Sequence, residues 1–142
     1  MKLLNFELAQ FSYAIELKGL GFIWDLHNSG EFLGLDLNPS KNAIVMKWRV
    51  SGHPSTQYSG CNLLFSGLKL MSISPRDEEL PQSEDVTVGG ISMVTPDINK
   101  DVAYRVRPQW NPDDPFHLVF EFQSRRSIEL DAETVELIGV PH

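Results

Sequence analysis

Residues Phe22 to Val50 read FIWDLHNSGEFLGLDLNPSKNAIVMKWRV and carry the clearest β-strand pattern of the chain. Apolar residues occupy alternate positions in three successive segments of it, which is the period of a β-strand with one buried face. Turn-forming residues separate the segments at Ser29-Gly30 and at Pro39-Ser40-Lys41-Asn42. The pattern therefore predicts a three-stranded antiparallel meander.

The alternation also predicts which side chains of the meander face each other. A first hairpin closed on Ser29-Gly30 and a second closed on a four-residue turn bring the apolar positions onto one buried face. The facing pairs expected are Leu26 with Leu33, Trp24 with Leu35, Phe22 with Leu37, Leu37 with Ile44, and Leu35 with Met46.

A second alternating segment lies near the C-terminus and begins at Phe116. A turn at Ser124-Arg125-Arg126 predicts another hairpin, with Phe122 facing Ile128, Phe120 facing Leu130, and Leu118 facing Ala132. Val135 and Leu137 fall out of phase with Ile128, which predicts a bulge between residues 131 and 134. Trp24 and Phe120 are both expected to be largely buried.

Other segments extend the β pattern along the chain, and no segment has convincing helical periodicity. The further strands are expected within Asn5–Leu17, Asn62–Ser74, Val86–Val94 and Val102–Val106. About nine short strands in one domain spanning residues 1–142 predict a single antiparallel β-sandwich. An open or closed β-barrel with a ligand cavity is the alternative.

Composition narrows the class of protein. The net charge of −7 argues against nucleic-acid binding, which needs clustered Lys and Arg, and equally against an anionic membrane surface. No membrane-spanning run or signal peptide is found, and Cys61 is the single cysteine, which excludes an internal disulfide. These features favour a bacterial-type cytoplasmic protein in which Cys61 is a small buried hydrophobe.

Candidate chemical motifs are incomplete. Asp97, Asn99 and Asp101 have the spacing of calcium ligands but lack the glycine and the final glutamate of such a loop, so we expect an Asx-rich turn. No two of the four histidines have metal-ligand spacing; His117 is expected to be exposed, and His53, in a glycine-bounded loop, is the best functional candidate. We expect no cofactor and no metal requirement for folding.

A catalytic trio of Ser55 or Ser59 with His53 and Asp25 is conceivable, but no nucleophile-elbow motif supports it. Active sites usually show clustered titratable groups, and the sequence concentrates none. An enzyme with an unrecognised site is therefore the last of three functional interpretations.

Two proline-stiffened loops, Pro75–Asp85 and Pro108–Pro115, are the predicted partner-binding surface. Trp110 is a possible apolar anchor at that surface, and Arg76 alone opposes the negative charge. The carboxylates of the two loops are Asp77, Glu78, Glu79, Glu84, Asp85, Asp113 and Asp114. Solvated connecting loops are the alternative interpretation of both segments.

These observations favour a non-enzymatic protein-binding module with acidic loops, and a small-molecule-binding β-barrel is the second interpretation. In its general composition the chain resembles small acidic bacterial immunity proteins, although no motif is shared. That resemblance implies neutralisation of a basic protein partner.

Overall fold

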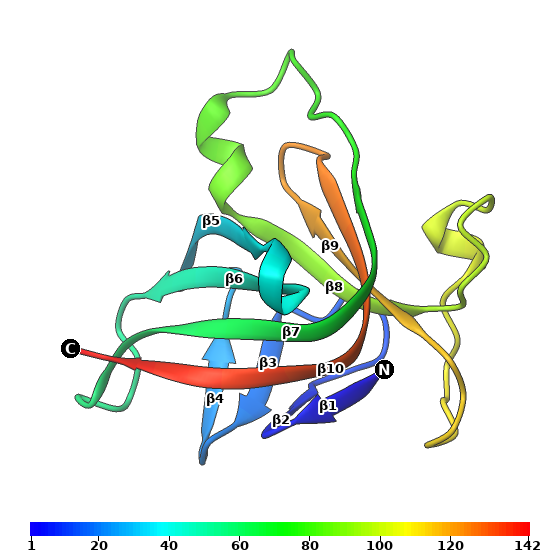
Figure 1. The fold of residues 1–142 in the computed structure, drawn as a ribbon. Helices are drawn as coiled ribbons and strands as arrows, with labels where there is room; N and C mark the ends of the chain where they lie inside the picture. The colour runs from blue at the N-terminus through cyan, green and yellow to red at the C-terminus, as the bar shows by residue number, and fades with distance from the viewer.

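The computed structural model describes all residues from 1 to 142 and is all-β (Figure 1). Its elements are β1 (Lys2–Leu4), β2 (Phe6–Leu8), β3 (Glu16–Gly19), β4 (Phe22–Asp25), β5 (Gly30–Asn38), η1 (Pro39–Lys41), β6 (Ala43–Val50), β7 (Tyr58–Ile73), η2 (Gln82–Val86), β8 (Val88–Val94), η3 (Val102–Tyr104), β9 (His117–Phe122) and β10 (Ser127–Pro141). The prediction of an all-β, mainly antiparallel fold is confirmed.

A curled sheet with the order β5-β6-β7-β10-β9-β8 forms the body of the molecule. The long strands β7 and β10, of 16 and 15 residues, run side by side along its centre (Figure 1). The short strand β1 pairs with β10 in parallel, and all other neighbours are antiparallel.

A second, three-stranded sheet, β2-β3-β4, contributes to the same core as the curled sheet. Leu17 and Trp24, which pair across β3 and β4, are completely buried, as are Ile44 and Met46 of β6. One cluster of 25 buried apolar residues joins the two sheets. Burial of this apolar area is the main stabilising contribution to the fold.

Several sequence predictions about register and burial are confirmed. Leu37 pairs with Ile44 and Leu35 pairs with Met46, as the four-residue turn requires. Trp24 and Phe120 are both fully buried. The irregularity expected in β10 lies at residues 131–132, where its register with β7 shifts.

The predicted first hairpin is wrong, because β4 pairs with β3 and β5 pairs with β6. The two-residue connection Leu20-Gly21 has positive φ at both positions, 56° and 81°, and joins Gly19 to its partner Phe22. Two-residue turns with positive φ at both positions match the twist of an antiparallel hairpin. The hairpin closed by Leu20-Gly21 therefore forms in place of the one predicted at Ser29-Gly30. The chain passes from one sheet to the other between β4 and β5.

The predicted burial of two β5 side chains is also wrong, since Leu33 is 50% exposed and Leu37 is 48% exposed. The register of β5 against β6 shifts between Phe32 and Gly34, and Gly34 has a φ of +124° that favours glycine. This bulge reverses the alternation, so Phe32 rather than Leu33 packs against the core. Leu37 lies near the end of a strand at the sheet edge.

The C-terminal hairpin forms with a register that differs by two residues from the prediction. Ile128 faces Phe120, and Leu130 faces Leu118. The turn lies one residue earlier than expected, because the N–H of Phe122 donates to the carbonyl of Arg126 and residues 123–125 close the hairpin. A shift of two residues keeps every side chain on its predicted face.

The strand predicted at Val102–Val106 is replaced by the 3₁₀ segment η3 and an isolated bridge between Val94 and Val106. Tyr104, expected on an alternating strand, is 80% exposed. Alternation over five residues was too short a signal to distinguish a strand from a turn in a connecting segment.

Candidate functional site

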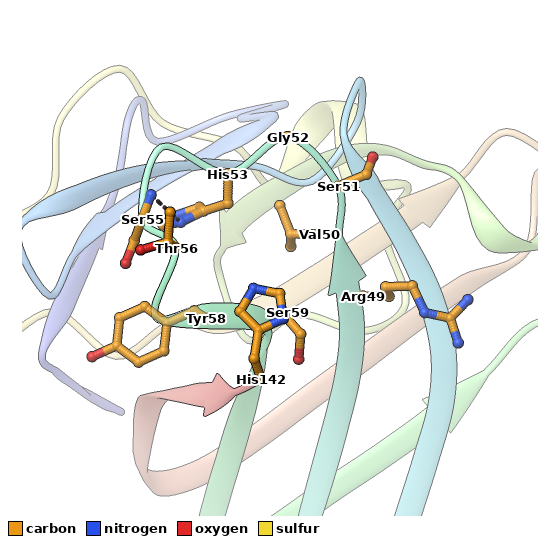
Figure 2. Close-up of a pocket in the computed structure, with 10 residues that line it drawn as sticks. All are labelled: Arg49, Val50, Ser51, Gly52, His53, Ser55, Thr56, Tyr58, Ser59 and His142. Atoms are coloured by element: carbon orange, nitrogen blue, oxygen red, sulfur yellow. Dashed lines mark hydrogen bonds between the residues drawn. The ribbon is translucent and has the colours of Figure 1, made fainter.

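The molecule has one cleft, which lies beside the loop 51–57 that joins β6 to β7 (Figure 2). We call residues 51–57 the cleft loop. The volume of the cleft is about 400 Å³. Its lining residues are Arg49, Val50, Ser51, Gly52, His53, Ser55, Thr56, Tyr58, Ser59 and His142. The sequence analysis singled out His53, Ser55 and Ser59 among these, and the structure brings all three to the cleft.

Backbone hydrogen bonds fix both ends of the cleft loop. The N–H of Ser51 donates to the carbonyl of Ser29 at 2.9 Å, which ties the loop to the start of β5. The N–H of His142 donates to the carbonyl of Gln57 at 3.3 Å and places His142 at the cleft. These two hydrogen bonds therefore hold the cleft loop between the start of β5 and His142.

His53 is packed among aromatic side chains. Its ring stacks on the indole of Trp24 with centroids 4.0 Å apart, and Phe22 and Tyr58 approach it at 5.0 and 6.4 Å. The backbone N–H of Ser55 donates to Nδ1 at 3.2 Å, so the neutral ring carries its proton on Nε2. Nε2 is buried and has no partner. Neither ring nitrogen of His53 is free to contact a ligand in this conformation.

Most of the side chains that line the cleft are polar or charged, and none of them is a carboxylate. The Arg49 guanidinium lies toward β5, away from His53 (Figure 2), where Nη1 pairs with Glu31 at 3.0 Å. Both partners of this pair are well exposed, so water screens their attraction. The groups at the cleft are therefore the Arg49 guanidinium, whose charge Glu31 partly neutralises, together with imidazole and hydroxyl groups.

The structure does not assemble the catalytic trio considered from the sequence. No hydrogen bond joins the hydroxyl of Ser55 or Ser59 to His53. The Asp25 carboxylate instead accepts the backbone N–H groups of His27 and Asn28. Burial opposes ionisation of Asp25, but these hydrogen bonds outweigh it and hold the pKa of the carboxyl below its ordinary value.

A second cluster of titratable groups lies away from the cleft and was missed by the sequence analysis. Arg105, which is 2% exposed, makes a bidentate ion pair with Glu129, with N–O distances of 2.9 and 2.6 Å. Nδ1 of His117 lies 2.7 Å from Glu129, and Nε2 lies 3.6 Å from Asp131. The guanidinium Nε also donates to the carbonyl of Thr95. We call Arg105, His117, Glu129 and Asp131 the buried ion cluster.

The expectation that His117 is exposed is wrong, because it is 8% exposed within this cluster. Alternation in β9 predicted correctly that its side chain points away from the phenylalanine face. The alternation of apolar residues in β9 gives no information about the connecting segment from Thr95 to Phe116, which Arg105 anchors to the sheet. Burial opposes ionisation of Glu129, but hydrogen bonds from Arg105 and His117 outweigh it and hold its pKa below the ordinary value.

Cys61 is a buried core residue of β7. Burial raises the pKa of its thiol to about 12, so the nucleophilic thiolate is scarce near neutral pH. This placement agrees with the interpretation of Cys61 as a small hydrophobe.

The first acidic loop, Pro75–Asp85, is organised around Arg76. Nε of Arg76 donates to Asp85 at 2.8 Å, and Nη2 donates to the carbonyls of Leu80 and Pro81. Hydrogen bonds from Arg76 and Ser124 hold the pKa of the Asp85 carboxyl below its ordinary value. The loop is therefore a defined structure held together by its one cation.

The predicted acidic residues of that loop differ in their surroundings. Asp77 pairs with the exposed side chain of Arg125 at 3.4 Å. Glu78, Glu79 and Glu84 make no ion pair, and the first two are exposed. The free negative charge of the loop thus lies mainly at Glu78 and Glu79.

The structure does not bring the two acidic loops together. Pro75–Asp85 is tied to the residues after β9, through the N–H of Asp77 and the carbonyl of Ser124. Pro108–Pro115 instead leads into the start of β9 at His117. The two loops lie at opposite ends of β9, one green at the top and one yellow to orange at the right in Figure 1.

Trp110 folds back onto the molecule. Its ring packs against the core and lies edge-on to Phe116, with centroids 5.8 Å apart, and the Arg107 guanidinium lies 4.8 Å from the ring centroid. Arg107 also pairs with Asp114 at 3.3 Å, whereas Asp113 is exposed. Packing accounts for much of the Trp110 side chain that was predicted to anchor a partner.

The calcium-like motif forms the Asx-type turn that its sequence favours. The Asp97 side chain accepts the N–H of Asn99, and its carboxylate pairs with Lys100. No group of three or more His, Cys, Asp or Glu side chains in the molecule is arranged to hold a metal ion.

Comparisons with protein-family models, curated proteins and solved structures gave no match to this chain. None of its helical segments has the length and apolar character needed to cross a membrane.

Proposed function

We propose that this chain is a non-enzymatic binding domain whose cleft takes up a small molecule. The supporting observation is that the single cleft gathers polar side chains from the end of β6, the cleft loop and His142. Small-molecule sites are concave, few per protein and carry a small number of oriented polar groups, and about 400 Å³ lies within their usual size range. This is the second of the interpretations drawn from the sequence.

Binding is favoured over catalysis because the cleft has no activated nucleophile. The Ser59 hydroxyl donates to the carbonyls of Val140 and Pro141, and both nitrogens of His53 are engaged or buried. A serine nucleophile needs a base within hydrogen-bond reach of its hydroxyl. Catalysis at an unrecognised site stays a prediction that is less favoured than binding.

A fragment screen followed by amide NMR tests this proposal. We expect some neutral, anionic or cationic fragments to shift the amide signals of residues 51–59 and 142. Thr56→Trp, which fills the cleft, should abolish those shifts. Gln57→Trp, a change of similar size at an exposed neighbour outside the lining, should preserve them. The proposal fails if no fragment shifts these signals or if T56W binds as wild type does.

A protein partner bound by the loop Pro75–Asp85 is the second candidate function. The exposed, unpaired carboxylates of Glu78 and Glu79 support it, because a loop already ordered by Arg76 loses little entropy on binding. A basic partner would complement them. Trp110, Asp113 and Asp114 would belong to a separate contact, since their loop lies at the other end of β9.

Affinity capture from the native host tests the partner. A captured protein should be lost with Glu78→Lys/Glu79→Lys and retained with the matched double change Glu7→Lys/Asp101→Lys at exposed carboxylates elsewhere. Equal capture by both double variants would remove the acidic loop from the interface. The cytoplasmic and bacterial assignments stay predictions from the sequence.

A further inference from the structure

The charge of the cleft differs from that of the whole chain. The chain has 19 Asp and Glu against 12 Lys and Arg, yet none of the ten lining residues is acidic. Arg49 is the lining residue with a permanent positive charge. Four others, Ser51, Ser55, Thr56 and Ser59, carry hydroxyl groups. A concave surface of this kind favours a ligand of opposite charge.

The cleft loop also has unused hydrogen-bond donors. No hydrogen bond within the protein uses the backbone N–H of Gly52, His53 or Thr56. The hydroxyl of Thr56 likewise has no protein partner. Gly52 and His53 are adjacent, and successive free N–H groups in a loop are typical of anion-binding concavities, because each peptide dipole presents its positive end.

Arg49 lines the cleft, and its guanidinium lies toward β5, from which it would have to turn to contact a ligand in the cleft. Its partner Glu31 lies on β5 and is not a lining residue. The next outward-facing residue of β6, Lys47, forms an equivalent pair with Asp36 of β5 but does not line the cleft. Two similar ion pairs thus lie side by side, and one of them borders the cleft.

We infer that the cleft binds a small oxyanion, either a carboxylate or a phosphate group, with donors from the cleft loop and positive charge from Arg49. The inference rests on the proposed small-molecule site and specifies its ligand class. Arg49 suits this role because a guanidinium presents several donors in the planar arrangement that carboxylate and phosphate oxygens match. An anion would compete with Glu31 for it.

Titrations with inorganic phosphate and with acetate test the ligand class. Tetramethylammonium and glycerol are the cationic and neutral comparison probes, and the readout is the amide NMR shift of residues 51–59 and 142. We expect saturable shifts with at least one of the two anions and none with the comparison probes. If neither anion shifts these signals, the inference is wrong.

Four charge variants show whether Arg49 is responsible. Arg49→Gln should raise the Kd of the anion about fivefold, whereas Lys47→Gln, which removes the same charge from the same strand, should change it less than about twofold. Glu31→Gln frees Arg49 and should lower the Kd, and Asp36→Asn is its matched control. Equal effects of R49Q and K47Q would indicate general surface charge and overturn the inference.

The outcomes separate this inference from the proposed function. If neutral or cationic fragments bind the cleft while anionic fragments, phosphate and acetate do not, the oxyanion assignment is wrong and the small-molecule site stands. If no compound of any class shifts the cleft signals, the proposed function itself is wrong. Chemical denaturation of each variant confirms that altered binding does not reflect unfolding.

Discussion

The imidazole of His53 is stacked on the indole of Trp24, with ring centroids 4.0 Å apart and 29° between the ring planes. Trp24 is fully buried in the core, so this contact joins the cleft loop directly to the packed interior. The shape of the cleft therefore depends on an aromatic contact between a polar loop and the three-stranded sheet.

Replacing His53 tests this contact. His53→Ala removes the stacked ring and should lower the free energy of unfolding by about 1–2 kcal/mol. His53→Phe keeps the aromatic ring and removes the unpartnered Nε2–H group, so it should restore most of that stability. Urea denaturation followed by tryptophan fluorescence is the measurement. Equal stability of wild type and H53A would show that the stacking contributes nothing.

Phe120 tests the core that the alternating pattern predicts. Its ring is fully buried and contacts the rings of Trp48 and Phe65. Phe120→Ala should lower the free energy of unfolding by roughly 3–5 kcal/mol, because burial is lost and a cavity remains. Phe120→Leu leaves a smaller cavity and should have a clearly smaller effect. Chemical denaturation gives both values, and an F120A loss below about 1 kcal/mol would contradict the packing.

Arg105 and Glu129 test the buried ion cluster. Arg105→Met leaves Glu129 without its main partner and should lower the free energy of unfolding by about 3–5 kcal/mol. The double variant R105M/E129L should recover much of this loss, since it removes both charges. Arg49→Met breaks an exposed pair with Glu31 and should change stability by less than about 1 kcal/mol. A double-mutant cycle without coupling would refute the interaction.

Glu129 should make stability depend on acidic pH. The pKa of its carboxyl is lower in the folded protein than its ordinary value of 4.5, so the unfolded chain binds a proton more readily. The stabilisation is complete above about pH 5 and is lost as the pH falls through the folded-state pKa. Glu129→Gln lacks this contribution. The difference in unfolding free energy between wild type and E129Q should be larger at pH 7 than at pH 3, and a constant difference would contradict the assignment.

The all-β class, the inward faces of β4, β6 and β9, and the pairing of β5 with β6 next to their turn could be predicted from the sequence alone. Period-two alternation is a local property, and it places Trp24 and Phe120 on buried faces whichever strands become their neighbours. The short turn between Leu37 and Ile44 likewise determines that these two residues pair. These features do not depend on contacts with the rest of the fold.

The sheet that β4 joins, the burial of His117 and the position of the cleft could not be predicted from the sequence. Each depends on contacts between distant parts of the chain, such as the 12 residues that separate His117 from Glu129, or the 85 that separate Gln57 from His142. The spacing of charged and polar residues along the sequence does not reveal such contacts. Long-range pairing is selected by the combined packing of the whole core, so the candidate site emerges only once the chain is folded.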